Sequence, residues 1–312
     1  MSIGVTSDAG PAVPPPLTPV RFLTEWAWEW PLLLGVAIVA LAYLWGVRTL
    51  HRRGVRWSPW RTLSFVAGLG LVVVATQSAL AAYDAVLLSV HMVQHMLLAM
   101  VVPVLLALGA PVTLALRTLP PRARALLLAV LHSRVARVLT FPAVAGVIFV
   151  ANPFVLYFSG LYEATLRHEW LHELNHVHFL LVGSLWFWTI LGLDPLPNRP
   201  AHPLRMLAVF VTLPFHAMLG IAIMSQSSVL AADWYGAVHR HWGPAPLADQ
   251  ELAGGLLWAA GDILGLLVFA ALFVQWARAS EREAQREDRR LDRLERLSRS
   301  EPPGERARPA DL

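Results

Sequence analysis

The sequence contains no cysteine and no lysine among its 312 residues, and only 15% of its residues are charged. Without cysteine, disulfide bonds, thiolate metal sites and thiol catalysis are all excluded. The absence of lysine makes all 25 basic residues arginine, a bias that we attribute to codon usage rather than to function. The low charge, 56% apolar residues and mean hydropathy of +0.53 lie outside the usual range of soluble domains.

Seven stretches are long and apolar enough to cross a bilayer, which takes about 20 mostly apolar residues. The expected fold is therefore all-α, a polytopic membrane helix bundle with about seven transmembrane helices, surrounded by membrane lipid. The spans are predicted at about 30–47, 62–82, 85–108, 138–158, 170–193, 204–230 and 250–276.

The segments outside these spans differ from them in composition. Residues 1–29 are proline-rich and lack a basic region ahead of an apolar core, so they predict a flexible lead rather than a cleavable signal peptide. Residues 30–276 form the predicted membrane domain, and residues 277–312 a charged cytoplasmic tail, helical at first. Residues 125–131 favour a short interfacial helix between two spans.

Arginine distribution predicts the orientation in the membrane. With the N-terminus outside, 22 of the 25 arginines fall in cytoplasmic loops and in the tail, as the positive-inside rule requires. The net charge of +4 thus reflects topology, and no nucleic-acid partner is expected.

Four spans place polar side chains at one depth near the outer surface. His91 and His95 lie one helical turn apart, as do His172 and His176. Ionisable groups inside a bilayer are costly, so such positions indicate function. The candidate metal ligands are His91, His95, His172, His176, His178, His216 and Asp249, with Met92, Met96, Met218, Met224 and Gln250 in support.

Imidazole and thioether without thiolate suit copper, and Cu(I) above all, whereas zinc needs only histidine and carboxylate. The members also have structural alternatives. The histidines, His178 above all and the pair His91 and His95, can be helix–helix hydrogen-bonding residues, the methionines lipid-facing or core residues, and Asp249 a helix N-cap. Three helix N-termini point at the proposed site and disfavour a cation, which Asp249, Glu173 and Glu251 would offset.

Residues 172–176 also match the H-E-x-x-H pattern of zinc peptidases, in which Glu173 would activate water. The pattern is short, and the sequence offers no evident third ligand. A copper or proton-coupled transporter is the other alternative. It would need polar residues through the inner halves of the spans, which are almost purely apolar.

The chain resembles the seven-span CtaG-type cytochrome c oxidase assembly factors over about residues 30–276. The likeness is carried by residues 91–98 (HMVQHMLL) with 109–111 (GAP), 176–180 (HVHFL) with 192–195 (GLDP), 214–217 (PFHA) and 247–250 (LADQ). It implies maturation of a haem-copper oxidase without catalytic turnover, through copper handling at the outer face of a bacterial cell (plasma) membrane. Expected partners are oxidase subunits and a copper chaperone. The matched positions are His91, His95, His176, His178 and His216, supported by Asp249 and Gln250, while His172 is added from helical geometry alone.

Overall fold

The computed structural model describes residues 13–198 and 200–300. The first 12 residues of the predicted lead, Arg199 and the last 12 residues of the tail lie outside the described residues. The described part is helical apart from an isolated antiparallel bridge between Trp26 and Ser78. The all-α membrane bundle predicted from the sequence is thereby confirmed.

Within the described residues, six helices are long and apolar enough to cross a membrane, or seven if a pair bent by 67° counts as one span. The pair is α10 (Pro142–Tyr157) and α11 (Leu161–Arg167). The others are α2 (Trp30–Arg52), α3 (Pro59–Gln77), the run α5, η1 and α6 (Leu88–Leu108), α12 (Glu169–Leu191), α13 (His202–Met224) and the first part of α15 (Pro246–Ser300).

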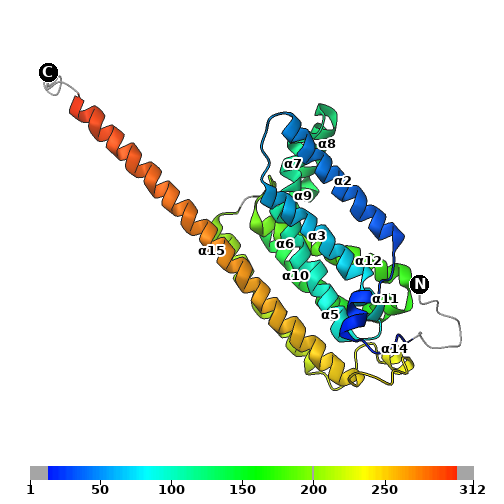
Figure 1. Ribbon diagram of the computed structural model, residues 1–312. Helices are drawn as coiled ribbons and strands as arrows, with labels where there is room; N and C mark the ends of the chain where they lie inside the picture. The colour runs from blue at the N-terminus through cyan, green and yellow to red at the C-terminus, as the bar shows by residue number, and fades with distance from the viewer. Residues whose placement is uncertain (1–12, 199, 301–312) are drawn as a thin grey trace.

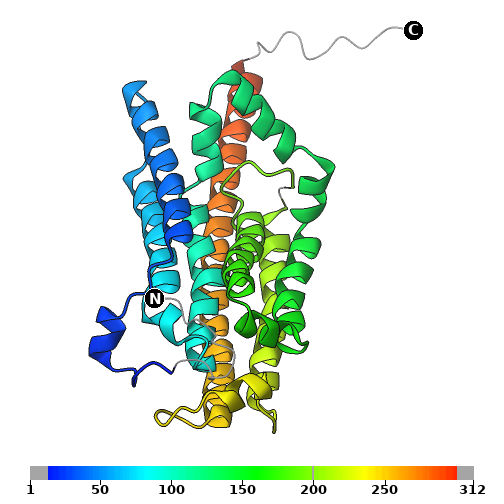
Figure 2. The same cartoon turned by 90° about the vertical axis from the view of Figure 1, so that its right-hand side faces the viewer.

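Short helices cluster at the two ends of the bundle (Figures 1 and 2). The end that we call the α4/α14 end carries α1 (Pro19–Thr24), α4 (Ala79–Tyr83), α11 and α14 (Ala232–Ala237). The opposite end, the α7/α8 end, carries α7 (Pro111–Thr118), α8 (Pro121–Leu131) and α9 (Arg134–Leu139). The short helix predicted at residues 125–131 is found within α8.

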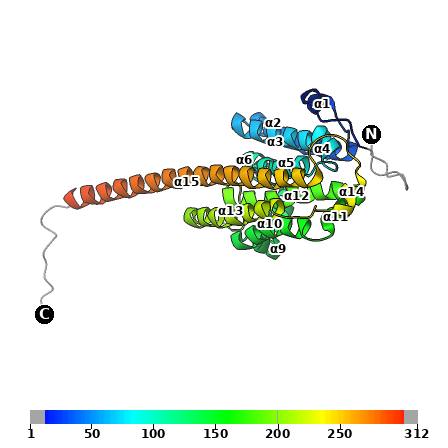
Figure 3. The ribbon, with the colours of Figure 1, turned by 90° about the horizontal axis from the view of Figure 1, so that it is seen from below.

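Several predicted boundaries differ from the structure. The second span ends at Gln77, because Ser78 adopts an extended backbone and its hydroxyl caps α4. The sixth span ends at Met224 rather than near residue 230. The last helix continues without a break through the predicted boundary at residue 277, and its charged half projects from the bundle as one rod (Figures 1 and 3).

Residues 13–29, predicted as part of a flexible lead, instead pack on the α4/α14 end. The Tyr83 hydroxyl donates to the carbonyl of Pro15 at 2.8 Å, and the Trp242 indole N–H donates to the carbonyl of Pro14 at 3.0 Å. Prolines lack an N–H but keep their carbonyl, so this segment offers acceptors to the aromatic donors of the bundle.

The bundle is apolar outside and locally polar inside, as a lipid environment favours. Large apolar side chains such as Leu34 and Phe210 are more than 60% exposed on its outer face. Gln77, His91 and Gln250 are completely buried. Because hydrocarbon cannot hydrogen-bond, these interior polar groups must find their hydrogen-bond partners within the protein. Polar groups at such costly positions indicate function rather than packing alone.

Helices α5 to α6 and α12 approach closely beside these polar groups. A Cβ at Gly183 would lie only 2.0 Å from the carbonyl oxygen of Ala99, so only glycine allows this contact. Ala99 belongs to the π-helical segment η1 (Leu97–Val101). Pro103 has no N–H to donate to the carbonyl four residues earlier, which is that of Ala99, and this explains the local π turn.

Candidate metal centre

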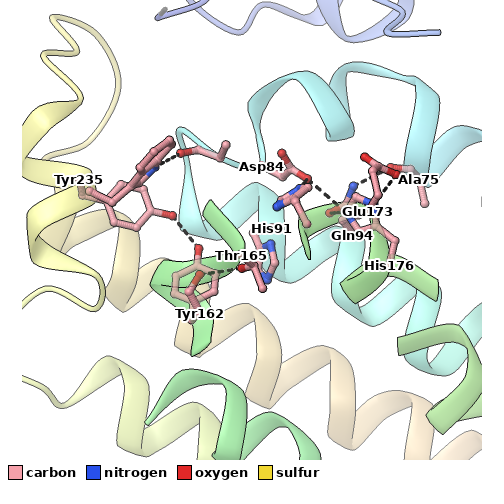
Figure 4. A network of polar contacts seen from close by, with 12 residues as sticks. Ala75, Asp84, His91, Gln94, Tyr162, Thr165, Glu173, His176 and Tyr235 are labelled. Atoms are coloured by element: carbon pink, nitrogen blue, oxygen red, sulfur yellow. Dashed lines mark hydrogen bonds and ion pairs between the residues drawn. The ribbon is translucent and has the colours of Figure 1, made fainter. Parts of the chain in front are cut away.

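A carboxylate from one loop meets two imidazoles from a distant helix at the α4/α14 end (Figure 4). Asp84 follows α4 directly, and His172 and His176 share one face of the first turns of α12. The Asp84 Oδ2 atom lies 2.8 Å from His172 Nε2 and 3.5 Å from His176 Nε2. One ligand atom from each residue lies within 4.8 Å of the others, so the three could hold a metal ion. We call them the carboxylate–histidine centre.

A hydrogen bond orients one side of the His176 ring, and a carboxylate lies near its other side. Its Nε2 atom lies 3.1 Å from Gln94 Oε1, and Gln94 in turn donates to the carbonyl of Ala75 at 2.9 Å. On the opposite side of the ring, His176 Nδ1 lies 3.6 Å from Glu173 Oε2. Both atoms are buried without a hydrogen-bond partner in the described part of the chain, so Glu173 acts on the His176 ring through its negative charge and not through a hydrogen bond.

Asp84 is held as an anion. Burial opposes its ionisation, but His172 and His176 outweigh that cost and hold the pKa of Asp84 well below its usual range. A second carboxylate behaves in the opposite way: burial, with repulsion from Glu173 and Glu169, raises the pKa of Glu29. Because these three glutamates repel one another, the approach to the centre is electrostatically attractive to a cation.

A second polar group continues from the centre into the bundle. The Tyr157 hydroxyl lies 3.1 Å from His91 Nε2 and 2.8 Å from His95 Nδ1, bridging the two imidazoles. The rings of His91 and His172 are 6.4 Å apart between centroids, so the bridge adjoins the carboxylate–histidine centre. His91 Nδ1 is buried without a hydrogen-bond partner in the described part of the chain.

The structure therefore gathers some predicted site residues and separates others. His91, His95, His172 and His176 form a continuous polar cluster, and His216 lines a small cavity together with His95. His178 is exposed and hydrogen-bonds Asn152 at 2.5 Å, as the helix–helix alternative predicts. Among the methionines, Met92 and Met96 are buried in the apolar core, Met224 is half-buried, and Met218 is 55% exposed.

Asp249 and Gln250 act as caps rather than as members of the centre. Asp249 accepts the hydroxyl of Ser89 at 2.5 Å and its backbone N–H at 3.3 Å, so it caps the first turn of α5 from another helix. Gln250 accepts from the N–H of Leu230 and donates to two backbone carbonyls, closing the turn after α13. Their predicted part in metal binding has no support in this geometry.

Two members of the cluster were missed from the sequence. Asp84 is the only acidic or basic residue, histidine apart, between Arg61 and Arg117, and this isolation was the available signal. Asp84 was missed because it lies in a loop between two predicted spans, whereas the predicted metal ligands lie within spans or at their starts. Tyr157 carried no comparable signal, since tyrosine near a membrane surface is ordinary.

The H-E-x-x-H alternative gains the third ligand that the sequence did not reveal, namely Asp84. The placement of Glu173 counts against it, however. The ring nitrogens that face Asp84 are the two Nε2 atoms, whereas Glu173 lies beside Nδ1 of His176, on the other side of the ring. A general base for hydrolysis must reach a metal-bound water, and Glu173 lies on the side of His176 that faces away from Asp84.

The fold and this site define a multi-pass helical membrane protein with a buried carboxylate–histidine cluster at one end of its bundle. Residues 41–279 match the family described as cytochrome c oxidase caa3 assembly factor (Caa3_CtaG). The chain belongs to this family, in agreement with the resemblance drawn from the sequence.

The chain is also similar to curated mycobacterial proteins. It is 42% identical over 292 residues to uncharacterized protein Mb0105 of Mycobacterium bovis and to uncharacterized protein MT0111 of Mycobacterium tuberculosis, and 37% identical over 290 residues to uncharacterized protein ML1998 of Mycobacterium leprae. Each alignment covers 91% of this chain and 44% of the relative, so the chain spans less than half of their length. No solved structure matches the chain.

Proposed function

We propose that the protein serves the assembly of cytochrome c oxidase by holding copper for delivery at the outer face of the bacterial plasma membrane, without catalytic turnover. The observation that carries the proposal is the carboxylate–histidine centre, in which an ionised, buried Asp84 faces two imidazole nitrogens. Copper is the proposed cargo, and we choose copper over zinc because the chain belongs to the oxidase assembly family.

The outer location rests on the arginine asymmetry. The α7/α8 end and the projecting part of α15 carry nearly all the arginines, so the positive-inside rule directs them to the cytoplasm. The α4/α14 end, with the centre and its approach, then faces outward. Copper centres of a haem-copper oxidase and a copper chaperone are the partners that we expect to meet this end.

The donor set refines the expected oxidation state. Cu(I) was favoured because histidines and methionines were expected at one site, but the centre consists of two nitrogens and a carboxylate oxygen, and Met218 faces outward. Nitrogen and oxygen donors suit Cu(II), with zinc as the main competitor. We therefore assign Cu(II) to this centre, which is reasonable for an outer, oxidising compartment.

A zinc hydrolase is the second candidate, because Asp84 completes a histidine, histidine and carboxylate set around H-E-x-x-H. The position of Glu173 behind His176 makes this the weaker of the two. The two proposals differ in what Glu173 must do, and its substitution by glutamine separates them.

The test combines oxidase activity in cells with metal content of the purified full chain. Asp84→Asn and His172→Ala should abolish high-affinity Cu(II) binding and lower cytochrome c oxidase activity in membranes. His239→Gln is the matched control, because His239 is exposed and its ring contacts the carbonyl of Ala237, two residues away. This variant should change neither Cu(II) binding nor oxidase activity. Normal oxidase activity in both centre variants would overturn the proposal.

A further inference from the structure

The charged half of α15 gathers arginines on one face. Because an α-helix turns by about 100° per residue, the positions of its side chains around the axis follow from the sequence. Seven arginines fall within an arc of about 120°, along about 27 Å of helix. They are Arg278, Arg282, Arg286, Arg289, Arg290, Arg293 and Arg296, and all are exposed. We call this face the arginine stripe.

Acidic residues border the stripe on both sides. Glu283 follows one edge and Asp292 the other, and between residues 278 and 296 no acidic residue falls within the arc. Beside the first edge, Glu287 Oε2 lies 3.7 Å from Arg290 Nη1. The positive face is therefore long and narrow, no wider than the helix itself, which measures about 10 Å across.

This arrangement is unfavourable for the helix alone. Like charges three or four residues apart repel each other along a helix, as Arg282 does with Arg286 and Arg289 with Arg293. A helix stabilised by its own ion pairs alternates the two signs at this spacing. Arginines sorted onto one face instead create a positive potential that an anionic partner would complement.

The direction of α15 decides which anionic partner fits. Its apolar half is a candidate membrane span, and its charged half continues that span without a break, beyond the other helices (Figures 1 and 3). A flat anionic bilayer would meet such a rod only near its first turns and would leave most of the stripe uncovered. A wide anionic surface such as a nucleic-acid duplex would also meet the acidic borders, which would repel it. A second helix has the matching length and width.

We infer that the arginine stripe is a docking surface for an acidic helix of a partner protein, laid along α15. Carboxylates of the partner pair with the stripe, and basic residues on the partner's edges pair with Glu283 and Asp292, as complementary charges do between paired helices. Arginine suits this role, because its guanidinium group binds a carboxylate through two parallel hydrogen bonds. The stripe lies beyond the end of the bundle opposite the carboxylate–histidine centre, and the inference is independent of the proposed copper function.

Photo-cross-linking in native membranes tests the docking surface. The cross-linking amino acid p-benzoylphenylalanine is placed in the full chain either at Gln285, at the edge of the stripe, or at Ala284, on the opposite side of the helix. Both positions are exposed. Gln285 should cross-link to a protein, and mass spectrometry should place the cross-link in a segment rich in aspartate and glutamate. Ala284 should give no such product.

Charge variants distinguish the stripe from net charge. The stripe variant combines Arg282→Gln, Arg286→Gln and Arg289→Gln, and it should lose the Gln285 cross-link. Glutamine favours helix and the change relieves repulsion, so α15 stays helical. The matched control removes three exposed arginines elsewhere at the α7/α8 end and should cross-link as the wild type does: Arg52→Gln, Arg56→Gln and Arg122→Gln.

A second variant keeps the net charge and breaks the stripe. It exchanges two neighbours, Arg286→Glu with Glu287→Arg, and it should also lose the cross-link. The docking surface is overturned if Gln285 gives no protein cross-link, or cross-links to lipid or nucleic acid alone. Equal protein cross-links from Gln285 and Ala284, or a Gln285 cross-link that persists in both charge variants, would overturn it as well.

Discussion

His172 Nε2 lies 2.8 Å from Asp84 Oδ2, although 88 positions separate the two residues in the chain. The contact joins the loop after α4 to the first turn of α12. It lies at the α4/α14 end of the bundle, next to the buried polar residues of the interior. An imidazole nitrogen and a carboxylate oxygen are both common metal ligands, so the proposed copper centre includes this pair.

Acidification should release copper through the histidines and not through Asp84. The pKa of Asp84 is lower in the folded protein than its value of about 3.9 in the unfolded chain. Ionised Asp84 therefore contributes fully to the stability of the fold above about pH 3.9, and this contribution is lost only as the pH falls through the lower pKa of the folded state. Imidazole must be neutral to bind metal, so protons compete increasingly with copper for the two histidines as the pH falls. Equilibrium dialysis between pH 8 and pH 4.5 measures this, and Cu(II) binding unchanged at pH 4.5 would contradict it.

Asp249→Ala should lower stability without changing metal content. It removes the cap that α15 provides to Ser89 at the start of α5, which typically costs about 1–2 kcal/mol. Thermal unfolding in detergent measures the loss, with Glu251→Gln, an exposed neighbour, as the control. If Asp249→Ala lost copper while keeping its melting temperature, Asp249 would be a ligand after all.

Glu173→Gln should preserve a copper-binding protein and remove only the charge behind His176. The variant loses a nearby negative charge but no hydrogen bond to the ligand, so copper binding should weaken but persist. Membrane oxidase activity should fall only in part. A zinc-dependent peptidase activity in the wild type that disappears in Glu173→Gln would instead establish the hydrolase.

Gly183→Ala should destabilise the bundle beside the π segment. The added methyl group would meet the carbonyl of Ala99, and overpacking of this kind costs about 1–3 kcal/mol or more. Gly70→Ala, with nothing within 4 Å, is the matched control and should be neutral. Equal melting temperatures for the two variants in detergent would show that α12 and η1 can separate at little cost.

The span pattern could be predicted from the sequence because hydrophobic length is a local property. Local arguments also identified the pairs His91 with His95 and His172 with His176, since one helical turn separates the members of each. The helix expected in the first part of the tail is present, and it continues the last span as one helix, because a change from apolar to charged composition does not end a helix unless a breaking residue accompanies it.

The site could be predicted only in part, because its decisive contacts join distant segments. Asp84 reaches His172 through the packing of a loop, and nothing in its immediate sequence indicates that partner. His216 and Met218 lie two residues apart on one helix, so they face different directions, and depth alone could not show that one is half-buried and the other exposed.

The most direct test of the central claim is electron paramagnetic resonance of the Cu(II)-loaded full chain. The account predicts one bound Cu(II) whose spectrum shows coupling to two imidazole nitrogens, reduced to one nitrogen in His172→Ala and lost from the high-affinity site in Asp84→Asn. A wild-type spectrum without imidazole coupling, or one unchanged in both variants, would contradict the assignment of Asp84, His172 and His176 as the copper centre.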